Sequence, residues 1–300
     1  MDKIISNIIY GFLWLLSKLP FKVLYFISDI IYLFLYYIIG YRKSIVRRNL
    51  KSFFPEKTDI ELKHIEKKFY KHFADLFIEM IKTFSISNQE LNKRFIIENT
   101  DVIDKLYQDN KSVIFNGSHY GNWEWGIQIA QVIKHHSVGI YAQVKNKFLD
   151  KMISQNRGRF GVEMVPKQKI LSKINTYSQD NKPSMYIFLS DQSPRMKRAY
   201  YWTDFLGKRV PVLTGAENVA KKYDMAMVLI RISKIKRGYY KANLELITDR
   251  PRQFPDYELT ELFLEKFTEQ IKEEPAYYLW THNRHKHSHR EHLKPEVGSL

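Results

Sequence analysis

The chain has 300 residues, of which 44% are hydrophobic and 27% charged. That size and composition suffice for one large folded domain or two small ones, so intrinsic disorder is not expected. Lys and Arg outnumber Asp and Glu by 48 to 32, and the net charge of +16 predicts an anionic partner such as nucleic acid, a bilayer surface, a phosphorylated lipid or an acidic protein. The absence of cysteine excludes disulfides, thiolate catalysis and cysteine-ligated zinc.

Residues 1–44 are apolar enough to predict a membrane anchor. One apolar run covers residues 4–16, and a second covers residues 23–39, in which Asp29 is the only charge. As a helix the second run would reach ~26 Å, slightly less than the ~30 Å of bilayer hydrocarbon. A marginal span and an interfacial hairpin therefore both stay open, with two buried core helices as the alternative. A signal peptide is disfavoured because no small-residue cleavage site follows.

The segment 41–51 that follows the apolar runs is strongly basic. It contains five Lys and Arg residues and no acidic residue: Arg42, Lys43, Arg47, Arg48 and Lys51. Each such charge beside an anionic leaflet contributes roughly 1 kcal/mol, and a basic flank of an apolar segment is typical of the cytoplasmic side. A solvated helix face is the alternative interpretation.

Residues 45–286 are predicted to form one α/β domain, with a mostly parallel sheet flanked by helices, and residues 287–300 a polar tail. Short apolar segments alternate with helical patterns, and no Gly- or Ser-rich linker divides them. Strands are expected at 112–116, 138–142, 162–165, 185–190, 227–232 and 240–247, the last two joined by a hairpin at 236–238. Helices are expected at 58–84, 123–133, 147–160, 169–179, 214–223 and 258–273.

Three polar clusters follow predicted strands, at residues 116–124, 143–146 and 190–195. Ligands in open α/β sheets collect beyond the carboxyl ends of the strands, so these clusters predict the functional site. In the first cluster His119 lies in a glycine-flanked loop and Glu124 in the first turn of a helix capped by Asn122. Gly121 would allow the turn that brings them together.

A neutral imidazole held in one tautomer by a carboxylate can remove a proton from a hydroxyl. The residues therefore suggest His119 as a general base with Glu124 as its partner. A purely structural His–Glu contact is the alternative that this spacing leaves open.

The segment HYGNWE, residues 119–124, resembles the His-x4-Asp/Glu motif of the glycerophospholipid acyltransferase superfamily. Its form is similar to that of the lipid A late acyltransferases, the lauroyl/myristoyl branch. The Asn-His-x-Ser-x-x-Asp form usual in glycerol-phosphate acyltransferases is absent, because Gly121 and Glu124 occupy its serine and aspartate positions. Further blocks resemble the family in the same order along residues 1–286: Arg157 and Arg159 in QNRGRFG, Ser190-Asp191-Gln192, Phe205-Leu206-Gly207 with Thr214-Gly215, and Trp280-Thr281-His282-Asn283-Arg284.

The resemblance implies an acyltransferase of the bacterial inner membrane with its active domain on the cytoplasmic side. A fatty acyl chain would pass directly from an acyl carrier protein thioester, or from acyl-CoA, to a hydroxyl of a phosphorylated glycolipid, a lipid A precursor. It implies His119 and Glu124 as the catalytic pair. It also implies substrate contacts by Arg157, Arg159, Asp191 and Gln192. No cofactor and no metal are expected, although five of the ten histidines lie between His282 and His292.

Several alternatives stay open on the sequence. In a related acyltransferase, the acceptor would be another glycolipid, an aminolipid or a lysophospholipid. In a hydrolase that uses the same His119, water would replace the lipid hydroxyl. A basic protein that binds nucleic acid is the alternative of another class. The apolar N-terminus and the lack of a known nucleic-acid module argue against it, so no nucleic acid is expected as a partner.

Overall fold

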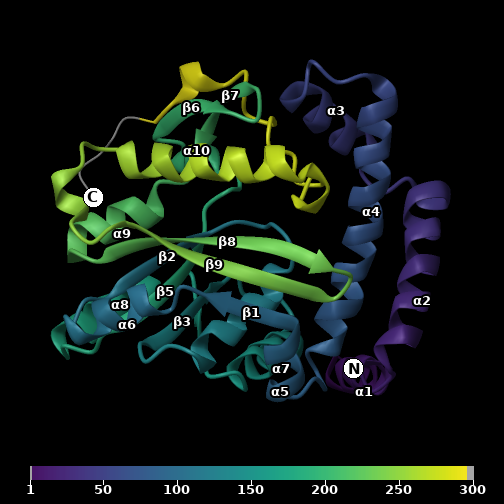
Figure 1. Ribbon diagram of the computed structural model, residues 1–300, viewed down its shortest axis with the longest axis horizontal. Coiled ribbons are helices and arrows are strands. Elements are labelled where there is room, and N and C mark those ends of the chain that lie inside the picture. The colour runs from purple at the N-terminus through teal and green to yellow at the C-terminus, as the bar shows by residue number, and fades with distance from the viewer. Residues whose placement is uncertain (1, 296–300) are drawn as a thin grey trace.

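The computed structural model describes residues 2–295 and is built around a seven-stranded sheet (Figure 1). The strand order is β1-β9-β8-β2-β5-β3-β4, and every neighbouring pair is parallel except β8 and β9. The strands are β1 Phe95–Glu98, β2 Val113–Gly117, β3 His136–Tyr141, β4 Glu163–Pro166, β5 Ser184–Leu189, β8 Ala226–Lys236 and β9 Tyr239–Thr248. The predicted α/β domain with a mostly parallel sheet is confirmed, and so is the late antiparallel hairpin.

Helices cover both faces of the sheet, as a mostly parallel sheet requires. All five residues of β2 are buried. Val113 and Phe115 pack against α6 (Asp101–Gln108) and the 3₁₀ helix η2 (Trp123–Gln131). Ile114, on the opposite face, belongs to a cluster with residues of α8, α9 and α10. These helices span Ile170–Gln179, Gly215–Tyr223 and Glu258–Glu273.

Several short elements differ from the sequence expectation. Residues 123–131 form a 3₁₀ rather than an α-helix, consistent with the poor α propensity of Gly126 and of the β-branched Ile127 and Ile129. Strand β1 and the antiparallel hairpin of β6 (Tyr201–Phe205) and β7 (Lys208–Val212) were not predicted. Neither were the short helices α5 (Asn88–Arg94) and α6.

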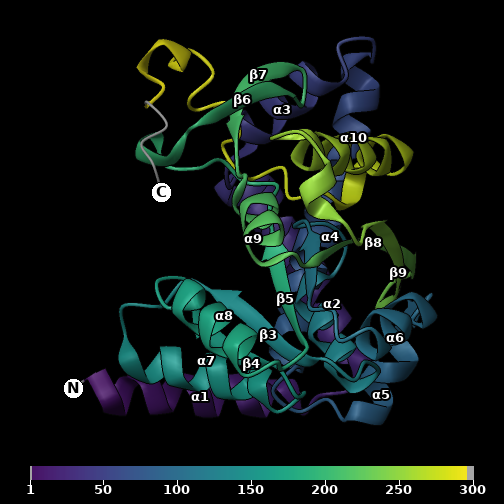
Figure 2. The same cartoon turned by 90° about the vertical axis from the view of Figure 1, so that its left-hand side faces the viewer.

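The N-terminal helices lie along the outside of the domain. Helix α1 (Asp2–Ser17) runs beside α7 (Lys147–Gly158), and α2 (Phe21–Leu33) stands beside the long α4 (Asp59–Lys82) (Figures 1 and 2). Helix α2 continues as the π-helical η1 (Phe34–Ile39), and the basic α3 (Lys43–Phe53) follows. Within residues 2–295, only the helix Phe21–Ile39 is long and apolar enough to cross a membrane. A capping box of Thr58 and Glu61 begins α4.

Candidate active site

The sheet brings the first and third polar clusters together. Strands β2 and β5 are parallel neighbours in register, with Gly117 opposite Leu189 at their carboxyl ends. The loops that follow therefore start side by side, and Ser190 donates its backbone N–H to the carbonyl of Gly117 at 3.0 Å. His119 lies two residues beyond β2 and Asp191 two residues beyond β5. Adjacent parallel strands thus place an imidazole and a carboxylate at the same edge of the sheet.

His119 is hydrogen-bonded to Asp191 through both its ring and its backbone. Its Nδ1 lies 2.8 Å from Oδ1 of Asp191, and its backbone N–H donates to the same oxygen at 3.1 Å. Asp191 is only 1% exposed. An ionised carboxylate can only accept, so Nδ1 carries the proton in neutral His119 and Nε2 is left as the basic nitrogen. The side-chain Nε2 of Gln192 lies 3.3 Å from this ring nitrogen.

The two groups shift one another's pKa. Burial acts to lower the pKa of His119, but the charge of Asp191, their hydrogen bond and the charge of Glu124 outweigh it and raise the pKa. Burial acts to raise the pKa of Asp191. Attraction to His119, together with hydrogen bonds from the ring and the backbone N–H of His119, outweighs this effect and lowers the pKa of Asp191. The arrangement therefore favours an ionised Asp191 beside an imidazole that accepts a proton readily.

Gly121 shapes the loop that carries His119. Its φ is +58°, and an added Cβ would lie 2.7 Å from Cγ2 of Ile232, so both conformation and space require glycine. Its N–H donates to the carbonyl of Tyr277 at 3.0 Å, and its carbonyl lies 3.3 Å from Nε2 of His72. Asn122 caps η2 by accepting from the backbone N–H of Trp125 at 3.0 Å, as predicted for this residue.

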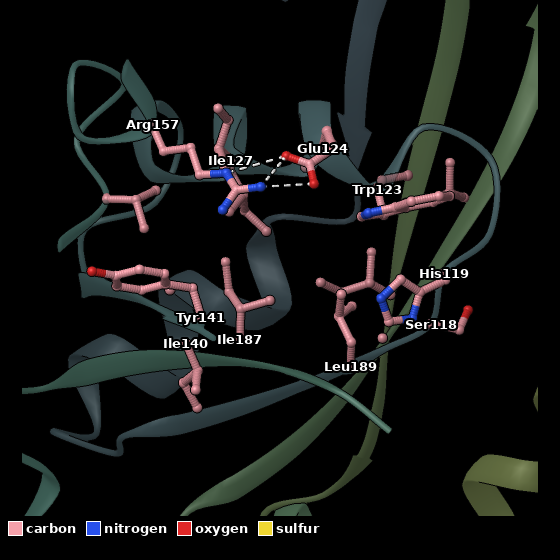
Figure 3. A pocket seen from close by; sticks show the side chains of 18 of the residues that line it. Ser118, His119, Trp123, Glu124, Ile127, Ile140, Tyr141, Arg157, Ile187 and Leu189 are labelled. Atoms are coloured by element: carbon pink, nitrogen blue, oxygen red, sulfur yellow. Dashed lines mark hydrogen bonds and ion pairs between the residues drawn. The ribbon is translucent and has the colours of Figure 1, made fainter. Parts of the chain in front are cut away.

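Glu124 does not hydrogen-bond to His119. It forms an ion pair with Arg157, whose Nη2 lies 2.8 and 2.7 Å from the two carboxylate oxygens, and both residues line the same cavity as His119 (Figure 3). The ring of Trp123 packs edge-on against the His119 imidazole at a centroid distance of 5.2 Å. The only influence of Glu124 on His119 is therefore that of its charge, which contributes to the raised pKa of the imidazole.

The cavity beside His119 has a volume of about 330 Å³ and a largely apolar wall. The polar residues Ser118, His119, Glu124, Tyr141 and Arg157 line part of it. The rest of the wall comes from η2 and from strands of the sheet, and it includes Ile127, Ile140, Met164, Ile187, Ile230 and Ala242. An apolar wall beside a few convergent polar groups suits an apolar ligand that carries one reactive polar end.

The remaining predicted substrate residues lie at different places. Gln192 contacts the His119 ring, as described above. Arg159 lies elsewhere: its guanidinium donates to the carbonyls of Phe84 and Ile86, which ties the end of α7 to the loop after α4. The second polar cluster follows β3, where Asn146 caps α7 and its side chain donates to Ser6 of α1 at 3.0 Å.

The C-terminal segment 278–284 also reaches the site, although none of its residues was predicted there. The N–H of Leu279 donates to the carbonyl of His119 at 3.1 Å, and Nε2 of His282 accepts from the N–H of Ser193 at 3.1 Å. Arg284 is fully buried and donates to Ser193 and to the carbonyl of Pro211. The Trp-x-His-x-Arg resemblance was the signal that marked this segment. His285 and His287 are also buried.

Comparison with known proteins assigns the chain to a family. The model of the family described as bacterial lipid A biosynthesis acyltransferase matches residues 2–287. The chain is 23% identical over 281 residues to the lipid A biosynthesis palmitoleoyltransferase of Escherichia coli K12. It is equally similar to a lipid A biosynthesis acyltransferase of Shigella flexneri, and each match covers 92% of this chain and 89% of the relative. The chain therefore belongs to the bacterial lipid A biosynthesis acyltransferase family, and it is an acyltransferase.

Proposed function

We propose that this enzyme transfers a fatty acyl chain from a thioester to a hydroxyl of a lipid A precursor, with His119 as the general base. One observation carries the proposal: the imidazole is bound through Nδ1 to the buried Asp191, and it lines an apolar cavity. The names of the two relatives support lipid A as the class of acceptor.

In the proposed reaction, Nε2 of His119 accepts the proton of the acceptor hydroxyl while its oxygen attacks the thioester carbonyl. The tetrahedral intermediate collapses to the ester, the C–S bond breaks, and the leaving thiolate takes the proton from the imidazolium. Asp191 holds the imidazole in the reactive tautomer and stabilises its positive charge. The acyl group passes directly from the thioester sulfur to the acceptor oxygen, so no acyl-enzyme is formed.

Glu124 and Arg157, which form an ion pair, are proposed to support the base and to bind an anionic group in the cavity. The charge of Glu124 helps to raise the pKa of His119, so it supports the base although Asp191 makes the hydrogen bond. Arg157 presents a guanidinium to the same cavity, where it can bind phosphate oxygens or a developing oxyanion. In the free enzyme Glu124 holds this guanidinium in place. Gln192, which contacts the imidazole, is proposed to position a substrate beside it.

The apolar cavity is proposed to hold the acyl chain, with its thioester end at His119. An acyl carrier protein is the proposed donor, because its acidic surface suits a chain with a net charge of +16. The proposed place of action is the cytoplasmic face of the bacterial inner membrane, where a phosphorylated glycolipid acceptor would be available to a basic enzyme.

The test uses the full-length protein in detergent with acyl carrier protein thioesters and an under-acylated lipid A precursor. Mass spectrometry should show a product heavier by one acyl chain, and His119→Ala should lower the rate at least about 10²-fold. Turnover retained by His119→Ala would refute the base. Free fatty acid as the sole product would indicate a hydrolase, and transfer only to a lysophospholipid would move the acceptor class. Acyl-CoA, tested in parallel, separates the two donors.

A further inference from the structure

The N-terminal helices α1, α2 and η1 carry a set of exposed apolar residues, which we call the anchor face. On α2 and η1 the exposed fractions are 67% for Phe26, 51% for Ile30 and 72% for Ile38, and on α1 they are 66% for Ile8 and 64% for Phe12. The spacing of four residues places each set on one side of its helix. The complete anchor face consists of Ile8, Phe12, Leu15, Phe26, Ile30, Leu33, Phe34, Tyr37 and Ile38. A patch of this extent marks a contact with lipid or protein.

The opposite side of α2 is fixed to the domain by polar contacts of its middle residues. The hydroxyl of Tyr25 donates to Glu79 of α4 at 2.8 Å, and that of Ser28 donates to Asp75 of α4 at 2.7 Å. Both acceptor side chains are buried, with exposed fractions of 0% for Glu79 and 2% for Asp75. These hydrogen bonds would be lost if α2 separated from α4.

Arg237 strengthens this attachment near the middle of α2. Its Nη2 lies 2.7 Å from Oδ1 of Asp29 and 2.6 Å from Oδ1 of Asp75, so one guanidinium joins α2 to α4. Arg237 belongs to the turn between β8 and β9, at the end of the sheet that approaches α2 and α4 (Figure 1). Three elements of the domain therefore meet at Asp29, the one acidic residue of the helix Phe21–Ile39.

This attachment conflicts with a membrane span. The helix Phe21–Ile39 has 19 residues, a length of about 28 Å, so Asp29 would lie near the centre of a bilayer crossed by it. The ion-paired Arg237, the adjacent Lys236 and the charged helix α4 would then lie at the same depth. A charge at that depth costs about 2.5–3.5 kcal/mol even on the most lenient scale. The conflict disappears if only the anchor face enters the lipid.

We infer that α1, α2 and η1 lie in the plane of an anionic bilayer and anchor the domain from one side without crossing. Both helices lie on the same side of the molecule, α1 seen end-on below α2 in Figure 1. The exposed Lys18 and Lys22 stand at their junction and Arg42 stands beyond η1, where they can contact anionic headgroups. Trp14 and Tyr37 are exposed on these helices, as expected for a membrane interface.

The anchor lies against a wall of the candidate active site. Helix α1 contacts α7, and α7 carries Arg157, which lines the cavity beside His119 (Figure 2). An in-plane anchor would therefore hold the cavity close to the lipid surface. The inference itself does not depend on the proposed reaction, because its tests measure binding and sidedness.

The first test measures flotation of the full-length protein with vesicles of phosphatidylethanolamine and phosphatidylglycerol. The double variant Phe26→Glu/Ile30→Glu should bind at least tenfold more weakly, because both side chains lie on the anchor face. Ile60→Glu is the matched control, since Ile60 is 82% exposed but lies at the start of α4, outside that face. Equal loss in the control, or binding unchanged in the double variant, would overturn the anchor face. The inference would also be overturned if the unaltered protein did not bind vesicles but formed a dimer, and if Ile30→Glu converted that dimer to a monomer.

The second test separates an in-plane anchor from a span. Because the chain has no cysteine, Lys18→Cys and Gln168→Cys create unique labelling sites at the helix junction and on the domain. The double variant is reconstituted in proteoliposomes, treated with a membrane-impermeant maleimide, and analysed as intact protein by mass spectrometry. An in-plane anchor predicts molecules with two labels or none before detergent is added. Molecules with one label each would show that the two sites lie on opposite sides, and would overturn the inference.

Discussion

His119 and Asp191 are 72 residues apart in sequence, yet Nδ1 of the imidazole lies 2.8 Å from Oδ1 of the carboxylate. The contact follows from the adjacency of β2 and β5, which end at the same edge of the sheet. It assigns the proton of neutral His119 to Nδ1 and leaves Nε2 as the basic nitrogen of the ring. The carboxylate that orients the imidazole therefore comes from another loop than the one that carries His119.

Replacement of Asp191 by Asn should reduce kcat by roughly 10²–10⁴-fold, because an amide neither fixes the tautomer nor stabilises the imidazolium. The loss of the carboxylate also removes the main influence that raises the pKa of His119. The base must be unprotonated to act, so the acid limb of the pH profile of kcat/KM should move to lower pH. A variant with normal kcat and an unmoved acid limb would show that Asp191 does not act on the base.

Replacement of Glu124 by Gln should move the same acid limb in the same direction but by less. Glu124 influences the pKa of His119 through its charge alone, whereas Asp191 acts through both charge and a hydrogen bond. Arg157 also loses its ion-pair partner in this variant. Comparison of the pH profiles of Glu124→Gln and Asp191→Asn under identical conditions measures the difference. A larger shift in Glu124→Gln would indicate that Glu124, as the sequence first suggested, is the principal partner of His119.

The sequence was sufficient to predict six of the seven strands of the sheet, because they are short apolar segments between helical patterns. It also predicted the three loops at the carboxyl ends of the strands. It could not predict which loops meet, since that depends on strand order: β2 lies between β5 and β8, which follow it by about 70 and 110 residues. The pairing of His119 with Asp191 rather than with the nearby Glu124 is a consequence of that order.

The sequence could not show that Arg157 and Arg159 contact different parts of the structure, because this depends on where helix α7 ends. Arg157 lies in the last turn of α7 and faces the cavity, while Arg159 follows the helix and binds the carbonyls of Phe84 and Ile86. A two-residue step at a helix end reverses the direction of a side chain. Strand β1 has four residues and follows α5 directly, so no turn residue marks the point where the strand begins.

A larger side chain at Gly126 should shift the preferred acyl donor toward shorter chains. Gly126 lines the cavity, and an added Cβ would meet no atom within 4 Å, so this position has open space into which the side chain of Gly126→Leu can extend. Gly139 also lines the cavity, but there a Cβ would lie 2.9 Å from Sδ of Met164.

Competition between acyl donors of different length, read as the product distribution by mass spectrometry, measures this preference. Thermal unfolding provides the control: Gly139→Ala should lower the melting temperature, whereas Gly126→Leu should leave it nearly unchanged. An unaltered product distribution in a folded Gly126→Leu variant would place the acyl chain elsewhere.

Glu79 should make the protein less stable as the pH rises from about 4.5 to about 7. Burial, only partly offset by the nearby Lys234, raises the pKa of Glu79 to about 7. The folded chain therefore keeps a proton in this interval that the unfolded chain releases, and the free energy of unfolding falls with pH, by at most about 3 kcal/mol. Glu79→Gln resembles the protonated side chain and should flatten this dependence in urea unfolding measured between pH 5 and 7.

Glu163 provides the matched control, because its pKa is displaced in the opposite direction. Although burial acts to raise it, hydrogen bonds from Tyr177, His136 and Lys173 lower the pKa of Glu163 to about 2. Its stabilising contribution is complete above about pH 4.5 and is lost only as the pH falls toward 2. Glu163→Gln should therefore lower stability by a similar amount at pH 5 and at pH 7.

The prediction for Glu79 is wrong if the free energy of unfolding of Glu79→Gln depends on pH as steeply as that of the unaltered protein. Glu79 would then be ionised in the folded state throughout this interval, and its contacts with Tyr25, Asn122 and Tyr240 would favour the charged form.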